Sequence, residues 1–117
     1  MVAASRKTSS LNGTKNFEIP GRFGNIDLAI LPINGLCVRP ANMRQVVMAA
    51  DQAAALTAVL NPTLALPHHY AFHSGQLGDR IITKGDQDPR HYTDALARVA
   101  PQVATRIVLP GTPVTVP

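Results

Sequence analysis

The sequence predicts an α/β fold with mainly parallel strands in the order β-α-β-α-β. Three short apolar runs that each end at a proline recur along the chain: IDLAILP (26–32), TLALP (63–67) and TRIVLP (105–110). Runs with so little polar alternation are typical of strands covered on both faces, as in a parallel sheet. Two helical patterns separate the runs, and right-handed crossovers through these helices would make the strands parallel.

The first helical pattern is AADQAAALTAVLNP, residues 49–62. It is rich in alanine, and Leu56, Val59 and Leu60 recur at helical spacing, which favours an amphipathic helix. An Asn-Pro pair follows Leu60 and predicts the end of the helix there.

The second helical pattern is DPRHYTDALARVAP, residues 88–101. Asp88 is the predicted N-cap, because a carboxylate there can accept from the first free backbone N–H groups, and Pro89 suits the first helical position. The predicted buried face consists of Tyr92, Ala95, Leu96 and Val99.

The carboxyl ends of the strands are the predicted location of a site. They would place Pro32-Ile33-Asn34, Pro67-His68-His69 and Pro110-Gly111 along one edge of the sheet, which is where open α/β sheets bind ligands. A further run, PVTV (113–116), is a candidate edge strand, and GQLGDRIITKGDQ (75–87) is expected to be a solvent loop because it lacks phosphate-loop spacing.

Composition and charge limit the class of protein. The 117 residues fit one domain, in which residues 1–20 are an expected flexible basic arm and residues 21–117 the folded part. Beyond residue 22 the chain is close to neutral, so nucleic acid is not an expected partner. No apolar run approaches the ~18 residues of a membrane span, and no signal-peptide pattern is present, so a cytoplasmic location is expected. Cys37 is the single cysteine, which excludes an internal disulfide and CxxC zinc chemistry.

The histidines in LALPHHYAFHSG (64–75) suggest an incomplete metal site. Adjacent residues of an extended segment point to opposite sides, so His68 and His69 are not expected to bind one ion together. His73 would share the side of His69 only if the chain turns helical, and His91 lies in the second helix. A catalytic zinc needs about three protein ligands, and spacing alone supports one or two.

Three stretches resemble a known family: GNIDLAILPINGL (24–36), NMRQVVMAADQAAALTAVLNPTLALPHHYAF (42–72) and VLPGTPVTV (108–116). Together they are similar to the C-terminal half of metallo-β-lactamase-fold hydrolases, in the branch that resembles ascorbate-6-phosphate lactonase. The resemblance implies half of an αββα sandwich, zinc or manganese in the completed fold, and metal-dependent hydrolysis of a lactone, ester or phosphoester. The family's P-x-H-Y histidine is a metal ligand, and the match to Pro67-His68-His69-Tyr70 assigns that role to His69, with His68 at the variable position.

The departures from the family pattern are as informative as the match. The H-x-H-x-D-H cluster of the family's N-terminal half does not occur in this chain, and Asn12-Gly13-Thr14 stands where the family has Gly-Asp-Thr. Asp27 matches a different aspartate, which opens the following strand. The expectation is therefore a fragment of a longer reading frame, or a half-fold, that is inactive alone and binds a small-molecule substrate only when completed.

Two sets of alternatives stay open. The candidate substrate-proximal residues are Asn34, His68, Tyr70 and His73, although Asn34 could be a turn residue and Tyr70 could pack under the loop with its hydroxyl satisfied locally. The alternative function is a non-catalytic binding or assembly module, which would form a homo-oligomer or pair with an N-terminal half, because half of a sandwich leaves one sheet face uncovered.

Overall fold

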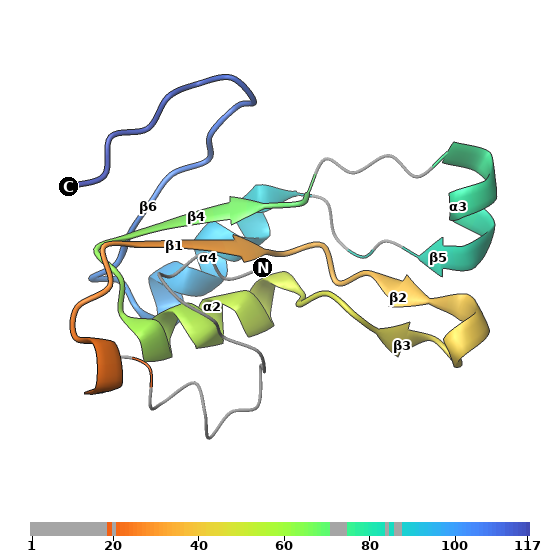
Figure 1. Ribbon diagram of the computed structural model, residues 1–117, viewed down its shortest axis with the longest axis horizontal. Helices are drawn as coiled ribbons and strands as arrows, with labels where there is room; N and C mark the ends of the chain where they lie inside the picture. The colour runs from red at the N-terminus through yellow and green to blue at the C-terminus, as the bar shows by residue number, and fades with distance from the viewer. Residues whose placement is uncertain (1–18, 20, 71–74, 84, 86–87) are drawn as a thin grey trace.

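The computed structural model of the protein describes residues 19, 21–70, 75–83, 85 and 88–117. This part of the chain forms a main body and a smaller lobe that projects from it (Figure 1). The main body contains β1 (Leu28–Pro32), α2 (Ala50–Leu60), β4 (Leu64–His68), α4 (Pro89–Val99) and β6 (Ala104–Thr105). The small lobe, defined here as residues 37–46 and 75–83, contains β2 (Cys37–Val38), the 3-10 helix η1 (Arg39–Ala41), β3 (Arg44–Gln45), α3 (Gly75–Ile81) and β5 (Ile82–Thr83).

The sheet of the main body is parallel and has the strand order β1-β4-β6. Strands β1 and β4 pair along their whole length, from Leu28 opposite Leu64 to Pro32 opposite His68. Strand β6 pairs only with the first two residues of β4. The prediction of an α/β fold with a parallel sheet and the order β-α-β-α-β in the main body is confirmed.

The C-terminal segment forms far less strand than the sequence predicts. Strand β6 ends at Thr105, so most of the predicted strand 105–110 is irregular, and the predicted edge strand 113–116 does not form. Prolines at 110 and 113 have no N–H to donate to a ladder, and Gly111 makes a turn with φ +82°. The prediction of strand 105–110 was therefore wrong beyond Thr105, the prediction of strand 113–116 was wrong, and the sheet keeps a short third strand.

Helices α2 and α4 lie side by side on one face of the sheet (Figure 1). Side chains alternate along a strand, and Ala29, Leu31 and Ala65 point toward the helices, where they are fully buried in the main hydrophobic cluster. Small alanines on the strands and on α2 allow the helices to approach the sheet closely. Burial of this apolar surface is the main source of stability in the main body.

A buried hydroxyl pair fastens the two helices to each other. Thr57 of α2 donates to the carbonyl of Ala53 (2.8 Å), so the hydroxyl of Tyr92 on α4 donates to Thr57 Oγ1 (2.8 Å). Both side chains are fully buried, and each hydroxyl is satisfied, as buried polar groups must be. Desolvation by burial raises the pKa of Tyr92, and the hydrogen bond between Tyr92 and Thr57 partly offsets this effect.

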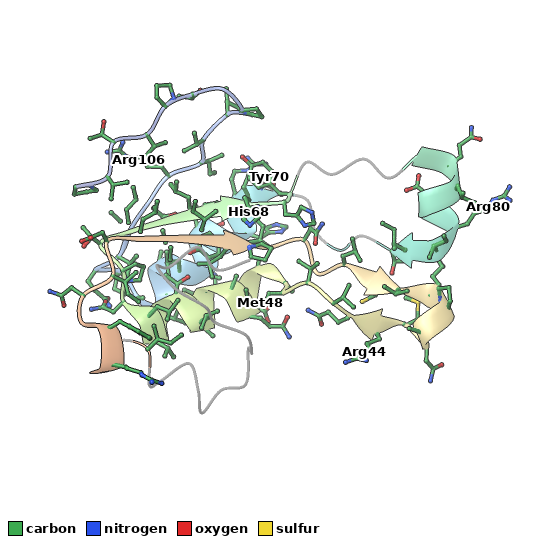
Figure 2. The ribbon with its side chains drawn as sticks, viewed as in Figure 1. Arg44, Met48, His68, Tyr70, Arg80 and Arg106 are labelled. Atoms are coloured by element: carbon green, nitrogen blue, oxygen red, sulfur yellow. The ribbon has the colours of Figure 1, made fainter. Side chains whose placement is uncertain are left out.

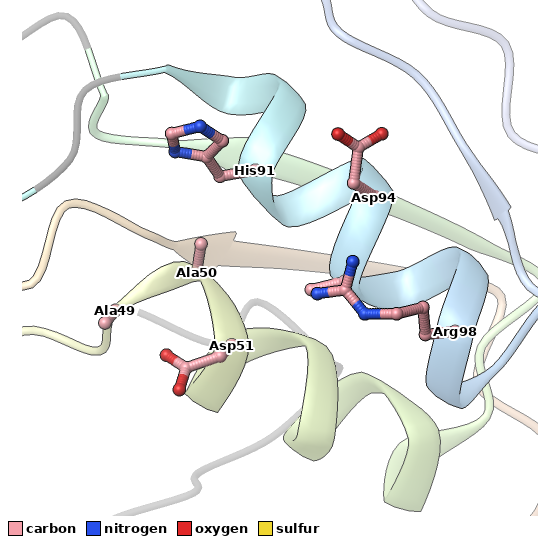
Figure 3. Close-up of a pocket in the computed structure, with 7 residues that line it drawn as sticks. Ala49, Ala50, Asp51, His91, Asp94 and Arg98 are labelled. Atoms are coloured by element: carbon pink, nitrogen blue, oxygen red, sulfur yellow. The ribbon is translucent and has the colours of Figure 1, made fainter.

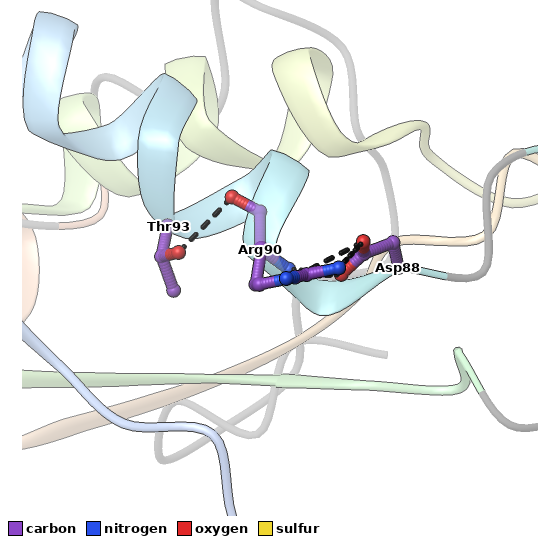
Figure 4. A network of polar contacts seen from close by, with 3 residues as sticks. All are labelled: Asp88, Arg90 and Thr93. Atoms are coloured by element: carbon purple, nitrogen blue, oxygen red, sulfur yellow. Dashed lines mark hydrogen bonds and ion pairs between the residues drawn. The ribbon is translucent and has the colours of Figure 1, made fainter.

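The helix ends follow the predicted signals, with one exception. Asp88 accepts from the backbone N–H of Arg90 (3.0 Å) as the N-cap of α4, and its carboxylate also pairs with the Arg90 guanidinium (2.8 Å; Figure 4). Asn61 ends α2 in the left-handed conformation, with φ +46°. Val99, predicted to lie on the buried face of α4, is 53% exposed and is the last residue of the helix.

The opposite face of the sheet has no helix on it among the described residues. Leu28, Ile30 and Leu66 point to this face by strand alternation and are only half-buried. In the C-terminal segment beyond β6, Ile107 and Leu109 are also exposed. This face, called the open sheet face below, is apolar and incompletely covered by the described chain.

The small lobe was not predicted from the sequence. Its sheet is antiparallel, in the order β3-β2-β5, and α3 lies against η1. The expectation of a solvent loop over 75–87 was wrong for residues 75–83, which form α3 and β5. Its two-residue strands and its helix bury no side chain, and so leave no apolar periodicity to detect.

Within the described residues, no helix is both long enough and apolar enough to span a membrane.

Candidate site at the carboxyl edge of the parallel sheet

The carboxyl ends of β1 and β4 meet at one edge of the sheet, as the sequence predicts. Pro32 pairs with His68, and the N–H of Ile33 donates to the carbonyl of His68 (3.2 Å). Asn34 lies two residues beyond β1, and His69 and Tyr70 directly follow β4, so four of the five candidate residues share this edge. Figure 2 shows His68 and Tyr70 there. The fifth candidate, His73, lies outside the described residues.

Asn34 is fully buried where the main body joins the small lobe. Its Oδ1 accepts from the N–H of Leu36 (3.2 Å), the local bond of an Asx turn, and its carbonyl accepts from Gly85 (2.8 Å). The side-chain Nδ2 is buried and has no hydrogen-bond partner among the described residues. Leaving such a donor unsatisfied costs roughly 1–3 kcal/mol, so an acceptor near Asn34 would be stabilising.

The backbone conformation of His69 changes the expected geometry of the histidine pair. The prediction that His68 and His69 point to opposite sides assumed extended backbone at both residues, but His69 has φ +64° and ends the strand alternation. Their ring centroids are 5.8 Å apart and the ring planes are tilted by 48°. Two imidazoles that share a tetrahedral zinc hold their centroids roughly 5 Å apart, given Zn–N bonds of about 2.0–2.1 Å.

A complete metal site is not formed by the described residues, which contain no group of three or more histidine, cysteine or acidic side chains placed to hold an ion. Cys37 lies in the small lobe, where its thiol donates to the carbonyl of Gly35 (3.5 Å). Asp27 precedes β1, at the opposite edge of the sheet from the histidines. Of the ligand set that the family resemblance implies, the described residues therefore contain His69 and no complete site.

Tyr70 fastens the C-terminal segment to this edge. Its ring packs against the main hydrophobic cluster, and its hydroxyl donates to the carbonyl of Val108 (3.1 Å). The hydroxyl is thus satisfied locally, as in the packing interpretation. Because β6 ends at Thr105, the segment reaches the edge through Val108, and the expected contribution of Pro110-Gly111 as a strand end was wrong.

A second feature of the structure is a cleft between α2 and α4, which was not predicted from the sequence. It has a volume of about 340 Å³ and opens between the first turn of α2 and one face of α4 (Figure 3). His91, Asp94 and Arg98 follow one another at helical spacing, the signal that could have revealed this shared face. The lining residues are Ala49, Ala50, Asp51, His91, Asp94, Ala95 and Arg98.

The chemistry of the cleft is that of an exposed surface. Its four ionisable side chains are all solvent-exposed, so water and salt screen their charges. Ala49 cannot cap α2 with its side chain. Only the reciprocal half of a capping box is present, in which Gln52 Oε1 accepts from the N–H of Ala49 (2.9 Å).

No protein-family model matches the sequence, and comparison with curated proteins finds no match.

Proposed function

We propose that this chain is the C-terminal part of a metal-dependent hydrolase that acts on a lactone, ester or phosphoester, and that it is inactive alone. The observation that carries the proposal is the His68–His69 pair at the carboxyl edge of a parallel sheet, at a spacing close to that of two ligands on one ion. His69 is the proposed metal ligand, and zinc or manganese the metal of the completed fold.

The incomplete ligand set supports a half-domain rather than a self-sufficient enzyme. Two imidazoles supply too few ligands for a catalytic zinc, and a second half that contributes H-x-H-x-D-H would provide the others. The open sheet face supports the same proposal, because parallel sheets are normally covered on both faces. A second half could cover the half-buried Leu28, Ile30 and Leu66.

The proposal is tested by metal analysis and histidine NMR of the purified chain. We expect zinc well below one equivalent after purification, because single imidazoles in water bind zinc weakly. Added zinc should shift the ring resonances of His68 and His69, and His69→Ala should remove this response. His91→Ala, which changes an exposed histidine of α4, is the matched control and should leave the response intact.

Two results would contradict the proposal. A tightly held stoichiometric ion that is lost in His69→Ala would mean that the chain has a complete site of its own. Zinc-induced shifts confined to His91 would mean that the histidine pair is not a metal site.

The open sheet face also favours a second candidate, a non-catalytic module that assembles with itself or with another half. Exposed apolar side chains beside a half-buried apolar sheet are typical of surfaces that bind a partner; Ile107 is 43% and Leu109 71% exposed. Light scattering should then give a mass above that of one chain, which Leu109→Glu should reduce. A stable monomer at high concentration would count against this candidate.

A further inference from the structure

The small lobe exposes apolar side chains at its surface and has no buried apolar core among its described residues. None of its described side chains is buried, although three strands and a helix would normally pack around an apolar centre. Its apolar side chains point to solvent instead: Met43 is 50%, Val46 54%, Leu77 73% and Ile81 41% exposed. These are four of the nine large hydrophobic side chains that are exposed in the described chain.

The described side chains of the lobe carry a net positive charge. Arg39, Arg44 and Arg80 are all exposed, against the single acidic residue Asp79, so the lobe carries three positive charges and one negative. None of the three arginines has an ion-pair partner among the described residues. Arg44 and Arg80 extend from different elements, β3 and α3, so the positive charge is spread over the lobe (Figure 2).

The hairpin tip holds an apolar side chain at the end of the lobe. Asn42 and Met43 both adopt the left-handed conformation, with φ +59° and +58°. Asparagine tolerates this conformation, but for methionine it is uncommon. The tight turn therefore contains a strained backbone conformation at Met43. The side chain of this methionine is half-exposed, and methionine is well suited to adaptable apolar contacts.

We propose that the small lobe is a docking surface for an acidic segment of a partner protein that also carries apolar side chains. The net positive charge of the lobe favours an acidic partner by charge complementarity. The exposed apolar side chains favour a partner whose own apolar side chains can bury them. Nucleic acid is disfavoured because the described lobe has no aromatic side chain on which bases could stack. A membrane surface is disfavoured because three arginines without interfacial aromatics form a weak lipid site. This inference is independent of the proposed hydrolase function.

The test is fluorescence anisotropy of the full chain with a labelled peptide in which glutamate alternates with valine. We expect binding that weakens with added salt and that Arg44→Glu/Arg80→Glu weakens by about tenfold or more. Leu77→Ser should weaken it as well. The matched controls lie on the main body, where Arg98→Glu/Arg106→Glu and Val99→Ser should leave binding unchanged.

Altered peptides separate the contribution of charge from that of apolar contact, and vesicles and an oligonucleotide test the alternative ligands. Replacing glutamate by glutamine, or valine by serine, in the peptide should weaken binding in each case, since both charge and apolar contact are required. All protein variants change exposed residues, and ¹H–¹⁵N spectra will check that they fold. Equal effects of the lobe and main-body variants would overturn the proposal. So would lobe-dependent binding that is tighter to phosphatidylserine vesicles or to a single-stranded oligonucleotide than to the peptide.

Discussion

The main body and the small lobe are built from similar elements but are stabilised very differently. In the main body, two eleven-residue helices cover a parallel sheet, and Leu31, Leu60 and Leu96 are almost completely buried. In the lobe, two-residue strands and a seven-residue helix bury no described side chain. Hydrogen bonds of sheets and helices contribute little net stability without apolar burial, so we conclude that the main body carries the fold and the lobe depends on it.

The largest expected difference between the two regions is in hydrogen exchange. Amides of β1 and β4 should exchange only through global unfolding, whereas amides of β2 and β3 should exchange through local opening. We expect protection factors about a thousandfold or more greater in the main body. Native-state exchange measured by NMR checks this, and equal protection in β1 and β2 would show that the lobe is part of the same cooperative unit.

Truncation of one leucine in each region should sharpen the comparison. Leu31→Ala removes a side chain that is 0% exposed and should lower the free energy of unfolding by about 2–5 kcal/mol. Leu77→Ala removes a side chain that is 73% exposed and should change it by less than about 0.5 kcal/mol. Urea denaturation measures both, and a loss in Leu77→Ala that approaches that of Leu31→Ala would mean that the lobe has a core.

The hydroxyl pair between the two helices should give a smaller, pH-dependent effect. Tyr92→Phe removes the bond to Thr57 and should cost about 1 kcal/mol at neutral pH. Burial raises the pKa of Tyr92 above its unfolded value, so its stabilising contribution is complete below about pH 10 and is lost as the pH rises through the folded pKa. Urea unfolding at neutral and at alkaline pH should show the gap between wild type and Tyr92→Phe narrowing. A gap that widens with pH would contradict this assignment.

The smallest expected effect is at the exposed cap of α4. The hydrogen bonds and charge of Arg90 lower the pKa of Asp88, so the stabilisation from the carboxylate is present above its unfolded pKa and is lost as the pH falls through the folded pKa. Asp88→Ala should lower the melting temperature near neutral pH and have little effect in strong acid. Asp88→Asn keeps a capping acceptor, so it should retain part of the stabilisation from the cap both near neutral pH and in strong acid. A loss in Asp88→Ala that is independent of pH would contradict the role of the carboxylate.

The elements that were predicted from the sequence are those whose stability is encoded locally or by periodicity. Helix α2 has an alanine-rich interior and an Asn-Pro stop, and α4 has its Asp-Pro start, so both formed as predicted. Strands β1 and β4 are continuous apolar runs, and the parallel pairing that brings Asn34 and His68 to one edge followed from the helical crossover through α2.

The features that were not predicted depend on contacts between distant parts of the chain. Pairing beyond Thr105 depends on whether the C-terminal segment stays beside β4, and that segment is instead held by Tyr70 through Val108. The lobe forms from two segments, 37–46 and 75–83, that are far apart in sequence and have no apolar pattern of their own. The residue types around His69 likewise do not predict its left-handed backbone conformation.

The sequence by itself determined the two helices, the apolar strands and their parallel order, because propensity, capping and periodicity act over a few residues. Only the tertiary structure decided the length of β6, the small lobe and the approach of the His68 and His69 rings. These depend on which distant surfaces are buried together, and on a single backbone dihedral that packing, not composition, selects.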